Sequence, residues 1–142
     1  METREWPLDM VARPEGGFLV SMGAALNAGP RTEASREIMP GFRIGSKHGG
    51  TVTKVSAEGD SVAVYADGLR EPYLGTYPAS RFLTASDQEG NFVPSTPIYA
   101  VGEGNFYGVP ATTSRTDRVP ETEEPITWIP HQVDPSALIT RG

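Results

Sequence analysis

The length, composition and charge of this chain exclude several classes of protein. Its 142 residues suffice for one domain with its own core, and the absence of cysteine excludes disulfides, thiolate metal sites and a cysteine nucleophile. The formal net charge of −6 argues against general attraction to nucleic acid or anionic lipid, although residues 31–54 carry five basic and two acidic side chains, a local net charge of +3.

Residues 1–30 are predicted to form an N-terminal arm followed by a strand. Trp6-Pro7 and Arg13-Pro14 favour extended structure, because a proline disfavours the helical conformation of the residue before it. The apolar run at 18–22 predicts the strand. Trp6 has two candidate roles: it anchors the arm on a neighbouring subunit, or it closes one end of the protein's own core. Both roles predict a covered side chain.

Residues 31–86 are predicted to form a short helix and a small β-barrel. Thr32 is a suitable N-cap and Pro40 would end the helix, which is therefore expected over residues 32–39. The barrel is expected over residues 40–86, with strands at 42–44, 51–55, 61–65, 73–77 and 82–84. The second and third strands form a hairpin, in which Val62 and Val64 share a face and are expected to point into the core.

The barrel segment resembles the SH3-like barrels of the Tudor and KOW type. The residues that carry the resemblance are Gly41-Phe42, the run GGTVTKV with its Glu-Gly-Asp loop, the run SVAVYADG, and YPASRFL as the turn into the last strand. In those domains the corresponding surface binds nucleic acid or peptides. The resemblance therefore implies a similar surface on this barrel.

The remaining chain is expected to contain a second hairpin and a C-terminal arm. Over residues 87–110, the turn at 102–105 predicts that 98–101 pairs with 106–109. Residues 111–142 are rich in proline and predict an extended arm. Within it, residues 126–129 form an apolar island that is costly to leave in water, so Ile126, Trp128 and Ile129 are expected to dock on a partner subunit or on the protein's own barrel.

The sequence contains few groups that could perform catalysis. His48 and His131 are the only histidines, and no phosphate loop, nucleophile elbow or carboxylate pair is evident, so we expect no enzyme activity, no cofactor, no metal and no small-molecule substrate. Positive charge beside aromatic rings is typical of nucleic-acid surfaces, whereas a solvated barrel face accounts for it equally well. The candidate nucleic-acid or peptide surface comprises Arg43, Lys47, His48, Lys54, Tyr65 and Tyr77.

Together these patterns predict a mainly β protein with an SH3-like five-stranded barrel, one short helix, an additional hairpin and extended arms at both ends. This architecture resembles small phage virion components, such as capsid decoration, head-completion or tail-associated proteins. We therefore expect a non-enzymatic structural protein held among other subunits by its arms, located in a virion or the cytoplasm. The alternative is a KOW-like or Tudor-like binding module. The longest apolar stretch, residues 17–26, is too short for a membrane span and lacks the basic segment of a signal peptide.

Overall fold

The computed structural model describes residues 6–24, 26–28, 36–39, 42–44, 48–77, 82–89, 95–109 and 121–129. Within these residues the protein is mainly β, as predicted, and has no helix. The strands form two four-stranded sheets and one three-stranded sheet. In chain order they are β1 (Trp6–Ala12), β2 (Phe18–Gly23), β3 (Leu26–Ala28), β4 (Arg36–Met39), β5 (Phe42–Ile44), β6 (Thr51–Val55), β7 (Val62–Ala66), β8 (Tyr73–Tyr77), β9 (Phe82–Ser86), β10 (Thr96–Ala100) and β11 (Thr127–Ile129).

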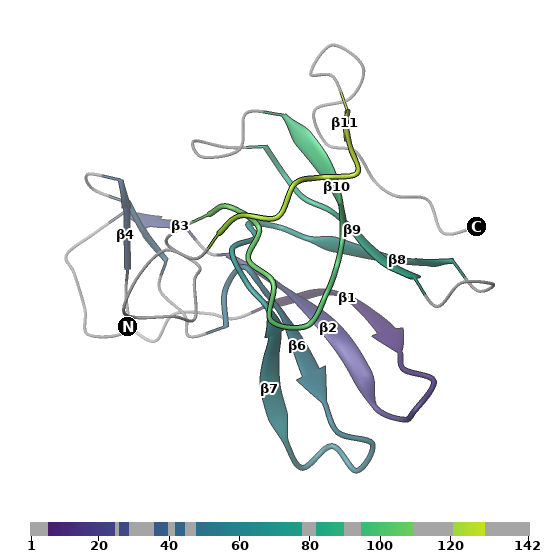
Figure 1. The fold of residues 1–142 in the computed structure, drawn as a ribbon. Coiled ribbons are helices and arrows are strands. Elements are labelled where there is room, and N and C mark those ends of the chain that lie inside the picture. Colours follow the sequence, from purple (N-terminus) through teal and green to yellow (C-terminus); the bar gives the residue numbers. More distant parts are fainter. Residues whose placement is uncertain are drawn as a thin grey trace.

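The first sheet has the strand order β1-β2-β6-β7 and lies in the lower half of Figure 1. Strand β2 confirms the strand predicted at 18–22, and β6 and β7 confirm the predicted hairpin, with Val55 opposite Val62. β1 pairs with β2 from Trp6 to Ala12, so this part of the N-terminal segment belongs to the sheet. Residues 1–5 of the predicted arm lie outside the described residues.

The second sheet has the strand order β11-β10-β9-β8 and lies in the upper half of Figure 1. The C-terminal apolar island forms β11, which pairs antiparallel with β10 so that Thr96 lies opposite Ile129. The backbone N–H of Ile126 donates a hydrogen bond to the carbonyl oxygen of Ile98 at 2.7 Å. The island therefore docks by its backbone on its own chain.

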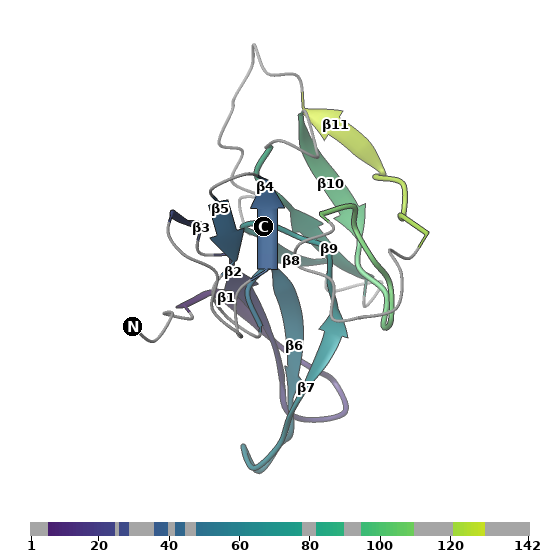
Figure 2. The same cartoon turned by 90° about the vertical axis from the view of Figure 1, so that its left-hand side faces the viewer.

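The third sheet, β3-β5-β4, overturns the helix predicted for residues 32–39. Residues 36–39 form strand β4, in which Arg36 pairs with Ile44 of β5, while residues 32–35 lie outside the described part. A helix of two turns is unstable alone, and pairing with β5 supplies hydrogen-bond partners for the same backbone. Figure 2 shows this small sheet beside the upper end of the first sheet.

The structure does not confirm the five-stranded barrel predicted over residues 40–86. The five strands exist as β5 to β9, but β5 lies in the third sheet, β6 and β7 in the first, and β8 and β9 in the second. No sheet in the described part of the chain closes into a barrel. The barrel does not close because strands from outside residues 40–86 occupy the edges that it would need. β2 pairs with β6, and β10 pairs with β9.

The segment between β7 and β8, residues 67–72, joins the two large sheets. Toward the first sheet, Ala24 donates its backbone N–H to the carbonyl oxygen of Arg70 at 2.7 Å. Toward the second sheet, the backbone N–H groups of Arg70 and Glu71 donate to the carboxylate of Asp87 at 2.8 and 2.7 Å. Leu69, at the centre of the segment, is fully buried. The core cluster consists of Leu19, Val52, Ala66, Leu69, Leu74, Leu83, Ala85, Tyr99, Val101 and Tyr107.

The hairpin predicted between 98–101 and 106–109 is wrong, although the turn between them exists. The N–H of Asn105 donates to the carbonyl oxygen of Gly102 at 3.3 Å, but β10 pairs with β9 and β11 instead. Phe106 forms an isolated parallel bridge with Asp67. Phe106 and Tyr107 are buried, so packing against the 67–72 segment, rather than pairing with β10, fixes this stretch.

Val62 and Val64 share a face of β7, as predicted, but this is not the face that packs on the core. Val62 is exposed and Val64 half-buried. The register shifts between Val52 and Thr53, which places Ala66 opposite Val52 on the core side of the sheet. The two valines therefore lie on the outer side of the first sheet.

Candidate functional site

The candidate nucleic-acid surface is not one surface in the described part of the structure. Its strand residues belong to three different sheets, and the side chains of the residues on β5 and of the last residue of β8 are outside the description. Arg43 lies on β5, Lys47 outside the described residues, His48 before β6, Lys54 on β6, Tyr65 on β7 and Tyr77 on β8.

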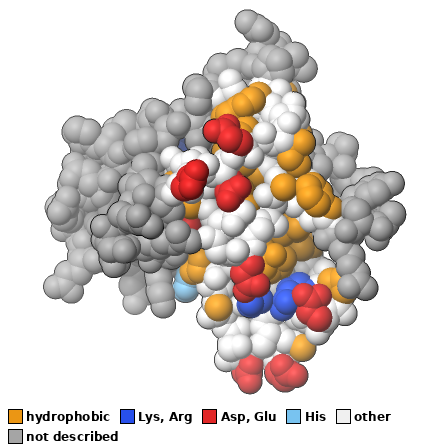
Figure 3. Space-filling view, viewed as in Figure 1, with side chains coloured by type: hydrophobic (Ala, Val, Ile, Leu, Met, Phe, Trp, Pro, Cys, Tyr) orange, Lys and Arg blue, Asp and Glu red, His pale blue; other side chains and the backbone are white. Residues whose placement is uncertain are grey.

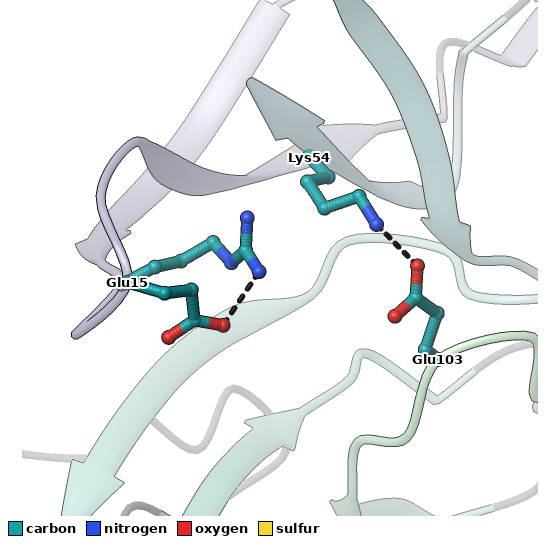
Figure 4. A network of polar contacts seen from close by, with 4 residues as sticks. Glu15, Lys54 and Glu103 are labelled. Atoms are coloured by element: carbon teal, nitrogen blue, oxygen red, sulfur yellow. Dashed lines mark hydrogen bonds and ion pairs between the residues drawn. The ribbon is translucent and has the colours of Figure 1, made fainter. Parts of the chain in front are cut away.

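Two basic side chains of the first sheet and its turns, Lys54 and Arg13, are bound to carboxylates. Lys54 forms an ion pair with Glu103 across the turn after β10, and Arg13 forms one with Glu15 at 2.5 Å (Figure 4). Figure 3 shows Lys and Arg side chains in one small area, beside acidic ones. A phosphate group would have to displace these carboxylates, which weakens the case for nucleic acid.

Of the two aromatic residues of that surface, Tyr65 packs on the core, and the side chain of Tyr77 lies outside the described residues. Tyr65 is half-buried and packs against the core cluster, so its ring contributes to the core. His48 is also half-buried, and its carbonyl oxygen accepts a hydrogen bond from the hydroxyl of Thr51 at 2.7 Å.

The predicted arm anchors lie on two edge strands. Trp6, on β1, lies against Gly23, where an added Cβ would be 2.3 Å from the indole Nε1. The side chain of Trp6 is 38% exposed in the single chain, which speaks against the alternative that it is covered by the protein's own core. On β11, Trp128 is 44% exposed and Ile129 half-buried, and Ile126, just before the strand, is 55% exposed. Whether a partner covers these side chains stays a prediction.

A larger apolar surface, which the sequence analysis missed, lies on the side of the first sheet that faces away from the core. We call it the outer face and define it by two rows of side chains across all four strands. The first row is Ala12, Phe18, Val55 and Val62, and the second is Met10, Val20, Thr53 and Val64.

The sequence carries a signal for this face. A strand with one solvated face alternates apolar and polar residues, whereas a strand covered on both faces is apolar throughout. The runs Phe18-Leu19-Val20 in β2 and Val62-Ala63-Val64 in β7 are apolar throughout. These two runs therefore indicate that the outer face of the first sheet also makes an apolar contact.

Several buried polar groups have structural partners, whereas the hydroxyl of Ser86 is buried without a hydrogen-bond partner among the described residues. Burial raises the pKa of Asp87 to about 7, although its carboxylate accepts backbone hydrogen bonds that favour the ionised form. Tyr107 donates its hydroxyl to the carbonyl oxygen of Ala100 at 2.8 Å and accepts the N–H of Gly102 at 2.9 Å. The rings of Tyr99 and Tyr107 lie 4.7 Å apart, and burial raises the pKa of both hydroxyls.

The described residues contain no cluster of three or more His, Asp or Glu side chains that could hold a metal ion. Nor does this part of the chain include a helix of the length and apolarity that crossing a membrane requires. Comparisons with protein-family models, curated proteins and solved structures gave no match to this chain.

Proposed function

We propose that this chain is a non-enzymatic structural protein that associates with other protein subunits through exposed apolar side chains. The observation that carries the proposal is the set of large apolar side chains left in water on two parts of the molecule, the first sheet and β11. The exposed members are Trp6, Met10, Phe18 and Val62 on the first sheet and Ile126 and Trp128 in the segment of β11. Phe82, at the start of β9, is exposed apart from these two groups.

Isolated exposed apolar side chains are common, but contiguous ones mark contact surfaces. Met10, Phe18 and Val62 belong to one sheet face, and Ile126 and Trp128 lie within three residues of each other on the edge of the second sheet. Trp is also over-represented among residues that dominate binding energies. The distribution therefore favours contacts with protein.

Among such proteins, a small phage virion component remains our proposal for the class, with capsid decoration, head completion and tail association as candidate roles. The support is architectural: a compact β scaffold whose chain ends add edge strands, β1 and β11, to the two large sheets. Relationship to the SH3-like barrels is likewise a proposal, supported by the presence of all five corresponding strands.

The test is the size of the native particle and the effect of Trp128→Ala. Gel filtration of a lysate from the cells that naturally produce the protein should place the chain well above its monomer mass of 15.2 kDa. Trp128→Ala should shift it toward the monomer, because a desolvated aromatic anchor usually costs about 2 kcal/mol or more when truncated. The matched control is Thr127→Ala, an exposed neighbour on the same strand.

The thermal unfolding midpoint of Trp128→Ala distinguishes a contact of Trp128 with other subunits from a role only in its own fold. Since Trp128 is partly exposed and β11 is held by backbone pairing, the midpoint of the purified Trp128→Ala chain should stay close to that of the parent. A large drop in the midpoint with unchanged particle size would show that Trp128 serves only its own fold. A monomeric parent in the lysate would contradict the proposed function itself.

A further inference from the structure

Residues 121–129, which we call the β11 segment, lie along two other parts of the chain. The backbone N–H of Glu123 donates a hydrogen bond to the carbonyl oxygen of Phe106 at 2.8 Å, and that of Ile126 donates to the carbonyl oxygen of Ile98 at 2.7 Å. Beyond these bonds, β11 pairs with β10, and Figures 1 and 2 show the two strands side by side. The segment thus forms the outermost layer of the second sheet.

The β11 segment is held by its backbone and buries few of its side chains. Of its nine residues, only Pro125 and Ile129 are half-buried, and the other seven are exposed. The core cluster contains no residue of this segment. Backbone pairing along a sheet edge, with little side-chain burial, is the way in which sheets bind an added strand from another chain.

The edge of β10 and the β11 segment match each other in length. Residues 96–98 of β10 pair with residues 127–129. Pro125 and Pro130 flank these three residues in the sequence, and proline has no N–H to donate, so pairing ends at both sides of the strand. Every copy of the chain carries both this edge and a strand that fits it. A second copy therefore has the chemistry that the edge of β10 accepts.

The connection before the β11 segment is long enough to reach a neighbouring copy. Residues 110–120 precede the segment, and eleven residues span at most about 36 Å, whereas a small domain is about 30 Å across. Short linkers typically hold a tethered partner at an effective concentration of about 1 mM. Pairing with a neighbour competes with pairing inside the chain once copies reach a similar local concentration, as they do in an assembly.

We propose that the β11 segment is exchanged between copies, so that β11 of one copy pairs with β10 of its neighbour. The exchanged segment makes the same hydrogen bonds, to the carbonyl oxygens of Phe106 and Ile98, and keeps the same register. Each copy donates one segment and accepts one, and a reciprocal exchange closes as a two-fold pair. The inference rests on the proposed function and names the contact that links the subunits.

The test uses cysteines placed on register partners of the full-length chain, which has none of its own. Ile98 and Thr127 lie opposite each other, and the Cα atoms of such partners are about 4.5–5.5 Å apart, within the range that a disulfide bridges. The variant with both Ile98→Cys and Thr127→Cys is equilibrated in a glutathione redox buffer. On a non-reducing gel, the ratio of linked dimer to internally linked monomer should rise at least about 10-fold between about 10 μM and about 1 mM protein.

The matched control is the variant with both Lys54→Cys and Ala63→Cys, register partners on β6 and β7. The short turn of this hairpin prevents exchange, so the control should give internally linked monomers at both concentrations. A second measurement mixes the two single variants, Ile98→Cys and Thr127→Cys, one of them carrying a size tag. Neither can form the disulfide within its own chain, so exchange should produce a disulfide between the two variants.

Circular dichroism of each variant establishes that it is folded. If the double variant with cysteines at 98 and 127 stays an internally linked monomer at both concentrations, or forms no more dimer than the control, the exchange is refuted. The absence of a disulfide between the mixed single variants at about 1 mM protein would refute it as well. If the parent chain still migrates in a large particle in the lysate, the proposed function stands while the exchange fails.

Discussion

Asp87 is the residue that holds the 67–72 segment against the second sheet. Each carboxylate oxygen accepts a backbone N–H, Oδ2 from Arg70 and Oδ1 from Glu71, and the side chain is fully buried. Arg70 adds a hydrogen bond from its guanidinium to the carbonyl oxygen of Glu89 at 2.6 Å. The segment is therefore fixed by specific acceptors, and not by packing alone.

Asp87→Asn should lower the free energy of unfolding by about 1–3 kcal/mol, because an amide nitrogen replaces one accepting oxygen and leaves a backbone N–H unpaired. The measurement is urea unfolding at neutral pH. Glu58→Gln, a change of the same kind at an exposed turn residue, should have little effect.

The pH dependence of this variant tests the raised pKa of Asp87. Between about pH 4 and pH 7 the folded protein keeps the proton that the unfolded chain has released, so this group makes the parent less stable as the pH rises through that window. The Asn variant lacks this contribution. The stability difference between parent and variant should therefore be larger near pH 4 than above pH 7, and a difference that grows with pH would contradict the assignment.

The turn between β1 and β2 lies so close to the end of β6 that it leaves no room for a side chain at Gly17. Gly17 has φ of +79°, and an added Cβ would lie 2.2 Å from the carbonyl oxygen of Val55. Gly59, in the turn between β6 and β7, has φ of +75° with nothing within 4 Å of an added Cβ. The two glycines share a backbone conformation and differ in their surroundings.

Alanine substitutions at Gly17 and Gly59 distinguish the cost of a positive φ from the cost of a steric clash. Gly59→Ala should cost only the left-handed conformation, about 1 kcal/mol. Gly17→Ala must also displace the end of β6 and should cost about 2–4 kcal/mol. Thermal or urea unfolding of both variants measures the difference. Equal costs would mean that the turn does not pack on β6 as described.

The strands were largely predictable from sequence, and their partners were not. Apolar runs bounded by glycine and proline located β2 and β5 to β9, because these signals are local. Pairing depends on residues distant in the sequence: β6 lies between β2 and β7, and β10 between β9 and β11. Residues 36–39 were predicted to be helical from the capping signals before them, but they form β4 because pairing with β5 outweighs these local signals.

In the candidate site, too, features set by neighbouring residues were predictable, and contacts between residues far apart in the sequence were not. Trp128 and Ile126 were identified because an apolar island in a Pro-rich segment is visible in the sequence alone. The Lys54–Glu103 pair removed a predicted cation from the candidate nucleic-acid surface, and a contact across 49 residues has no local signal. The outer face required the register of four strands before its rows could be recognised.

For the whole molecule, two sheets share one core and each leaves an apolar surface in water. The first sheet offers its outer face, and the second offers the side chains of β11 at its edge. The first sheet and β11 lie at opposite ends of the fold in Figure 1, so one subunit could contact two neighbours at once. Such bivalence strengthens an assembly well beyond either contact alone.

The most direct test of association through exposed apolar side chains is hydroxyl-radical footprinting of the chain, both purified and in its native particle. The side chains of Met10, Phe18 and Trp128, exposed in the single chain, should be modified less in the particle because other subunits cover them. Those of Tyr99 and Tyr107, buried in the core, should be modified equally little in both. Equal modification of the three exposed side chains in the purified chain and in the particle would contradict the account.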